Sequence, residues 1–76
     1  MTDFNSELDA RGLNCPLPIL RTKKSMSSMA AGEILKVVAT DPGSIKDMEA
    51  YAKQTGHDII DRTESDGEFT FYIKKN

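Results

Sequence analysis

Residues 9–18 read DARGLNCPLP, the stretch in which a predicted strand turns into a predicted helix. The four residues Arg11-Gly12-Leu13-Asn14 are expected to form the turn. Pro16 and Pro18 fit the first turn of a helix, because the amide group that proline lacks has no helical partner there. The helix is therefore predicted to begin near Cys15.

On either side of this stretch the apolar residues repeat at strand and helix spacing. A short strand is predicted at about Ser6–Ala10, and the helix should run to about Met29. On a helical wheel, one side of the helix gathers the residues expected to be buried, which are Ile19, Thr22, Met26, Met29 and Ala30.

A second strand and a second helix follow. Glu33–Thr40 is rich in β-branched residues, and its alternation places Leu35, Val37 and Ala39 on one face of a central strand. The next helix has two candidate starts, either Asp41 as N-cap followed by Pro42, or Ser44 as N-cap with Asp47 three residues later. Its buried face is expected to contain Ile45, Met48, Ala52 and Thr55.

The chain is predicted to end in a β-hairpin. Gly56 suits the left-handed residue that ends the second helix. Strands at about Asp58–Glu64 and Glu68–Lys74 are joined through Ser65-Asp66-Gly67, and Asp-Gly is a strong hairpin signal. In the last strand the inward residues should be Phe69, Phe71 and Ile73, and the residues on the open face Thr70 and Tyr72.

This order of elements predicts an α/β two-layer sandwich. The expected arrangement is βαβαββ, with a four-stranded mixed sheet and two helices on one of its faces. A chain of 76 residues is short enough to form one domain, residues 1–76.

The composition indicates in which compartment the protein works and which classes of partner it has. A single cysteine allows no disulfide within the chain, which in so small a protein favours a reducing compartment, and we expect the cytoplasm. Residues 1–6 are polar and acidic, without the features of an export signal, and no segment is long enough to span a bilayer. The formal net charge of −2 and the scattered Lys and Arg residues argue against direct nucleic-acid binding. We expect no membrane partner, and a monomer when the protein is free.

Cys15 is the candidate reactive residue. At a helix N-terminus the unpaired amides and the macrodipole favour a thiolate, so its pKa is expected below the ~8.5 of a free cysteine, with Arg11 adding a second positive influence. Pro16 and Pro18 stiffen the turn and should hold the sulfur at the surface. Most single cysteines are inert packing, but a helix start after the polar Asn14 favours exposure and reactivity.

The other chemistries of cysteine lack their second group. The fourth position of a C-x-x-C pair is Pro18, and one cysteine with one distant histidine is too few ligands for a metal, so neither a metal nor a cofactor is expected. The only histidine, His57, follows a helix end and is interpreted as a surface turn residue and not as a base. The simplest adduct is then a sulfane sulfur held as Cys15–S–SH, which suggests a carrier more than a catalyst.

An apolar patch next to the thiol is a candidate docking surface. Leu17 projects opposite the buried side of the helix, and Leu20 lies at its margin, although single exposed leucines are common. Arg11, Arg21 and the pair Lys23-Lys24 could steer an acidic partner, the alternative being ordinary solvated surface.

Two aspartates and three methionines have structural interpretations. Asp41 and Asp47 could form a paired acid site, but helix capping explains both and is the preferred interpretation. Met26, Met29 and Met48 have helical spacing on buried faces, which is typical of a core and not of a metal site.

Residues 9–18 resemble the TusA/SirA-like sulfur carrier family, whose mark is C-P-x-P at the start of the first helix. Gly32-Glu33, Asp41-Pro42 and Gly56-His57 look like the corresponding family positions between the later elements. The resemblance covers the whole chain, in length and in the order of the elements.

This resemblance implies a βαβαββ fold and a persulfide carrier of sulfurtransferase type rather than a stand-alone enzyme. Cys15 would accept sulfur from a cysteine desulfurase or a rhodanese-like donor and pass it to an acceptor protein. Pro16, Pro18 and Gly12 would support the motif, and Leu17 occupies its variable position. Family members serve tRNA thiolation, molybdenum cofactor metabolism, sulfur oxidation or thiosulfate use, and the sequence does not select among these routes.

The competing interpretation is a small RNA-binding or regulatory module without sulfur chemistry. The predicted layout also resembles RNA-binding α/β domains such as the C-terminal domain of a translation initiation factor. The mild acidity and the scattered basic residues count against this alternative.

Overall fold

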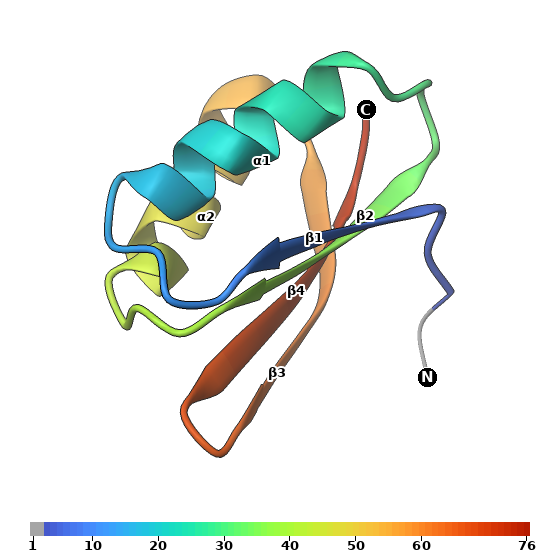
Figure 1. Cartoon of the computed structure of the whole chain (residues 1–76). Helices are drawn as coiled ribbons and strands as arrows, with labels where there is room; N and C mark the ends of the chain where they lie inside the picture. Colours follow the sequence, from blue (N-terminus) through green and yellow to red (C-terminus); the bar gives the residue numbers. More distant parts are fainter. Residues whose placement is uncertain (1–2) are drawn as a thin grey trace.

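The computed structural model of the chain describes residues 3–76 (Figure 1). Met1 and Thr2, part of the N-terminal segment considered above, lie outside the described residues. The elements in chain order are β1 (Ser6–Ala10), α1 (Leu17–Ser27), β2 (Ile34–Ala39), α2 (Ser44–Thr55), β3 (Asp58–Ser65) and β4 (Glu68–Lys74). The predicted βαβαββ order is confirmed.

The four strands form one mixed sheet in the order β1-β2-β4-β3. β1 and β2 are parallel, whereas β4 is antiparallel to both β2 and β3. Figure 1 shows α1 and α2 together on one face of this sheet. The fold is therefore the predicted α/β two-layer sandwich.

The core lies between the helices and the sheet. Its fully buried members include Met26 from α1, Met48 from α2 and, from the strands, Leu35, Val37 and Phe71. The strand residues are those that the two-residue alternation predicted, because successive side chains of a strand point to opposite faces.

Helix α1 is shorter than predicted at both ends. Pro16 is its N-cap, and its last residue is Ser27, so the predicted limits at Cys15 and Met29 were two residues too wide on each side. Met29 is still buried, but Ala30 is exposed. The prediction for Ala30 was wrong because the helical wheel does not extend beyond the end of the helix.

The buried face of α2 also differs from the prediction. Its buried residues are Ser44, Met48 and Tyr51, while Thr55, expected to be inward, is exposed. Thr55 ends the helix and its hydroxyl donates a hydrogen bond to the carbonyl of Tyr51. Tyr51, which was not expected on the buried face, packs inward with its large aromatic side chain.

The start of α2 follows neither predicted capping scheme. The N-cap is Gly43, without a side-chain cap, and the hydroxyl of Ser44 instead donates back to the carbonyl oxygen of Asp41. The Asp41 carboxylate accepts from the Gly43 amide and so closes the turn before the helix. At the other end Gly56 is left-handed, with a φ of 82°, as predicted.

The β3–β4 hairpin has the turn that its sequence predicts. Ser65 pairs with Glu68, which leaves Asp66 and Gly67 as a two-residue loop. Both have positive φ, 52° and 78°, the conformation that a type I′ turn requires and that favours Asp-Gly.

Candidate functional site

Cys15 lies in the loop between β1 and α1 and is exposed. One residue, Pro16, separates it from the first helical residue, Leu17, and the peptide bond between Cys15 and Pro16 is cis. Pro16 is exposed, but Pro18 is fully buried. The loop is thus anchored in the core by the second proline of the motif while its thiol faces outward.

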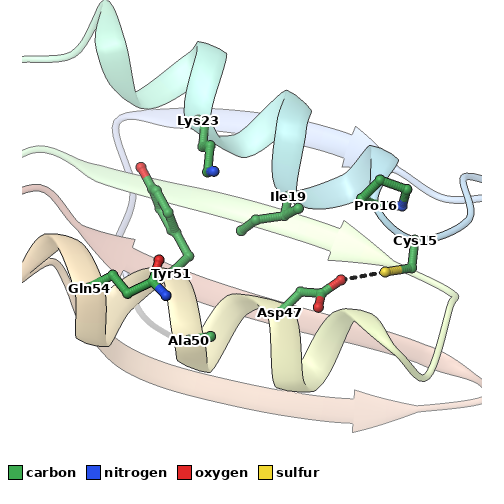
Figure 2. A pocket seen from close by; sticks show the side chains of 8 residues that line it. All are labelled: Cys15, Pro16, Ile19, Lys23, Asp47, Ala50, Tyr51 and Gln54. Carbon is green, nitrogen blue, oxygen red and sulfur yellow. Dashed lines mark hydrogen bonds between the residues drawn. The ribbon is translucent and has the colours of Figure 1, made fainter.

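Two carboxylates, one before α2 and one within it, accept hydrogen bonds from Cys15. Its thiol donates a hydrogen bond to Oδ2 of Asp47 at 2.6 Å, and its backbone amide donates to Oδ2 of Asp41 at 2.6 Å (Figure 2). Asp47 belongs to the first turn of α2, and Asp41 precedes that helix. The site therefore joins the loop after β1 to the loop after β2.

These contacts reverse the predicted direction of the thiol pKa. The hydrogen bond to Asp47, followed by desolvation and by the charges of Asp47 and Asp41, raises the pKa of Cys15 above its ordinary value. The prediction of a lowered pKa was wrong for a physical reason. Cys15 lies before the helix, its amide is already bonded to Asp41, and the nearest charges are negative.

Arg11 does not supply the expected positive charge to the thiol. Its guanidinium binds the Asp9 carboxylate through Nε at 2.9 Å and Nη2 at 3.1 Å, and lies 3.6 Å from Glu68. This pairing lowers the pKa of Asp9 to about 2, mainly through the side-chain hydrogen bond from Arg11. The charge of Arg11 is thus engaged by two carboxylates, and the charges that shift the pKa of Cys15 are those of Asp47 and Asp41.

A groove between α1 and α2 leads away from the thiol. It has a volume of about 150 Å³. Its walls are formed by Cys15, Pro16, Ile19, Lys23, Asp47, Ala50, Tyr51 and Gln54. Figure 2 shows the thiol at one end of the groove and Lys23 with Tyr51 toward the other. A sulfur atom added to Cys15 would have room to lie in this groove.

The remaining predicted residues lie around this centre. Gly12 has a positive φ of 79° and its amide donates to the hydroxyl of Thr40, which ties the two loops together. Leu17 and Leu20 are 44% and 50% exposed, and Arg21 is also exposed. All three belong to α1, at spacings that place them on one face of the helix.

His57 takes part in contacts at the far end of α2. Its Nδ1 accepts a hydrogen bond from the Asn76 amide at 3.0 Å, and its ring packs against that of Tyr51, with 5.6 Å between the centroids. These contacts join the end of the chain to the helix layer, in keeping with a structural interpretation of His57.

Within residues 3–76 no group of three or more His, Cys, Asp or Glu side chains is placed to hold a metal ion. None of the helices in this range is both long and apolar enough to cross a bilayer.

Asp47 is the site residue that the sequence interpretation missed. Capping was preferred for it, yet its carboxylate makes no capping bond and instead accepts from the thiol. A usable signal existed in the topology. Cys15 and Asp47 both follow the carboxyl ends of strands, β1 and β2, that are parallel neighbours in the sheet, and such ends meet at the same edge of a sheet.

Cys15 is expected to be alkylated slowly by iodoacetamide at neutral pH. Because its pKa is raised, the neutral thiol persists to higher pH, and the rate should reach its half-maximum at a higher pH than in the urea-unfolded chain. Intact mass measured over time at several pH values gives the two profiles. A folded-state midpoint at or below the unfolded one would contradict the assignment of the Asp47 bond.

Comparison with known proteins places these features in a family. Residues 6–75 match the sequence profile of the family described as sulfurtransferase TusA. The chain is 58% identical to the sulfur carrier protein TusA of Allochromatium vinosum over the full length of both, and 40% identical to that of Pseudomonas putida over 99% of this chain and 96% of the other.

A solved structure shows the same fold. The crystal structure of a SirA-like protein from Desulfitobacterium hafniense superposes with a TM-score of 0.83, at 26% identity, covering 92% of this chain and 96% of the other. The expected fold class and the resemblance that rested on residues 9–18 are both confirmed.

Proposed function

Because this chain belongs to the TusA family of sulfur carrier proteins, we propose that Cys15 is the residue that receives the sulfur and holds it as a persulfide. The observation that supports this assignment is the exposure of the only cysteine in the chain at the open end of a groove. Carrying a sulfane sulfur needs one accessible thiol and no second cysteine within the protein. Pro18 and Gly12 would serve by fixing the loop that presents the thiol.

The transfer follows the chemistry of thiol exchange. The Cys15 thiolate attacks the outer sulfur of a donor persulfide, the S–S bond of the donor breaks, and the donor thiolate leaves. The product is Cys15–S–SH, and no net oxidation occurs because the sulfane sulfur moves without a change in oxidation state. Attack on that outer sulfur by an acceptor thiolate breaks the new bond and regenerates Cys15.

The partners proposed are proteins and not nucleic acids. A cysteine desulfurase or a rhodanese-like protein would supply the sulfur, and an acceptor protein would receive it in the cytoplasm. We propose that the chain, residues 1–76, works as one domain and is a monomer between these encounters. The candidate routes include tRNA thiolation and molybdenum cofactor metabolism, and identification of the acceptor protein is the first test between them.

Loading with sulfur is the direct test of this function. The protein is incubated with a cysteine desulfurase and cysteine, or with a rhodanese and thiosulfate, and its intact mass is then measured. A mass gain of one sulfur atom that dithiothreitol removes is the expected result. No gain from either donor would contradict the assignment of Cys15 as a persulfide carrier.

The exposed face of α1 is the proposed docking patch, defined as Leu17, Leu20 and Arg21. Leu17→Ser and Leu20→Ser are each expected to weaken binding to the donor protein about 10- to 100-fold, since full burial of a leucine contributes about 1.5–3 kcal/mol. Titration calorimetry with the donor measures the loss.

A matched control is available on another element. Ile60 on β3 is similarly exposed, at 43%, so Ile60→Ser should leave the affinity for the donor unchanged. Equal losses in all three variants would show that the α1 patch has no special role. Arg11 is the other basic docking candidate. Its guanidinium is paired with Asp9 and Glu68, and its role in docking stays a prediction.

A further inference from the structure

The charged groups around the Cys15 thiol are unevenly distributed. Asp47 of α2 accepts a hydrogen bond from the thiol at 2.6 Å, and Asp41, in the loop before α2, accepts one from the Cys15 backbone amide at 2.6 Å. The basic residue of the same groove, Lys23 of α1, lies toward the opposite end, near Tyr51 (Figure 2). The field at the sulfur is therefore set by two carboxylates.

Asp41 and Asp47 differ from four other carboxylates of this protein, which are paired with a cation. Asp9, Glu7, Glu49 and Glu68 each form an ion pair with a Lys or Arg of the chain. Among residues 3–76 no cation forms an ion pair with Asp41 or Asp47. Asp41 accepts from two backbone amides, whereas the bond found for the Asp47 side chain is the one from the thiol.

We propose that Asp47 makes Cys15 selective for sulfur donors that present a positive charge beside their persulfide. The proposal rests on the proposed function, in which Cys15 is the carrier. In the free protein Asp47 retains the proton on the thiol, and a neutral thiol is a poor nucleophile. A Lys or Arg of the donor that pairs with Asp47 removes the hydrogen-bond acceptor and offsets its charge, so that the thiol can ionise.

In the exchange that follows, the sulfur moves to Cys15 and the proton of Cys15 moves to the donor. The Cys15 thiolate forms a bond to the outer sulfur of the donor persulfide as the S–S bond of the donor breaks. The proton released from Cys15 is taken up by the departing donor thiolate, through solvent. An approaching donor or small disulfide that carries negative charge meets Asp47 and Asp41 unpaired and is repelled.

Two small disulfides of similar length and opposite charge test this selectivity. Cystamine carries two ammonium groups and 3,3′-dithiodipropionate two carboxylates, and each forms a mixed disulfide with Cys15 that mass spectrometry quantifies. The measured quantity is the ratio of the two rate constants at low ionic strength. Asp47→Asn should lower the cystamine preference about five- to tenfold, which matches the loss of one nearby charge acting oppositely on the two reagents.

The ratio separates charge selectivity from other effects of the substitution. A general change in thiol pKa speeds both reagents alike and cancels in the ratio. Asp47→Glu retains the charge and should keep the preference, and added salt should reduce it in the unmodified protein. Asp66→Asn, in the hairpin turn, removes the same charge at a position that also favours Asn and should leave the ratio unchanged.

Two results would overturn the proposal. One is an unchanged ratio in Asp47→Asn, and the other is an equal fall in Asp66→Asn, which would assign the preference to net charge. Neither depends on persulfide chemistry, because both reagents are disulfides. Sulfur loading by a desulfurase, followed separately, therefore distinguishes failure of this proposal from failure of the carrier function.

Discussion

Cys15→Ser is expected to abolish sulfur loading while leaving the protein folded. The chain contains no other cysteine, so nothing else in it can form a persulfide. Serine keeps a hydrogen-bond donor for Asp47 at an exposed loop position, and the free energy of unfolding should change by less than about 0.5 kcal/mol. Intact mass after incubation with a desulfurase and cysteine, together with a urea unfolding curve, measures both effects.

A relocated thiol provides the control for this variant. Cys15→Ser combined with Ser65→Cys places the single cysteine at the exposed end of β3, away from the groove. If presentation by the motif matters, the desulfurase should load this thiol far more slowly than Cys15. Equal loading of the two proteins would show that any exposed thiol suffices and that the site around Cys15 has no part in the transfer.

Phe71→Ala is expected to lower the free energy of unfolding more than truncation of any other fully buried side chain. Phe71 is fully buried in β4, paired with Val37 of β2 and Arg62 of β3, and it has the largest side chain among the fully buried residues. Truncation of a buried phenylalanine costs about 3–5 kcal/mol. The free energy of unfolding of a chain of this length is about 4–11 kcal/mol, at about 0.05–0.15 kcal/mol per residue, so much of the variant should be unfolded.

Phe4→Ala is the matched substitution at the edge of the fold. Phe4 is 43% exposed and contacts Tyr72 and Lys36 on the open face of the sheet. Its loss should cost less than about 1 kcal/mol. Urea unfolding followed by circular dichroism compares the two variants, and a Phe71→Ala cost as small as that of Phe4→Ala would contradict the assignment of the core.

Local sequence patterns predicted most of the fold, because they report local physical constraints. The strand Ser6–Ala10 and the hairpin turn at Asp66-Gly67 were found where expected. Strand alternation and the backbone freedom of glycine depend on neighbouring residues alone. Errors came at helix ends and on the wheel of α2, where Tyr51 packs inward and Thr55 does not, since packing against the sheet chooses between faces that the sequence leaves nearly equal.

The sequence by itself determined the fold class and, through its single cysteine beside two prolines, which residue to examine. The tertiary structure alone decided the chemistry of that residue. Asp47 lies 32 positions from Cys15 along the chain, and only the parallel pairing of β1 with β2 and the packing of α2 beside α1 bring its carboxylate to the thiol. Electrostatic effects depend on distance in space, so the sign of the pKa shift followed the nearest folded charges and not the local helix start.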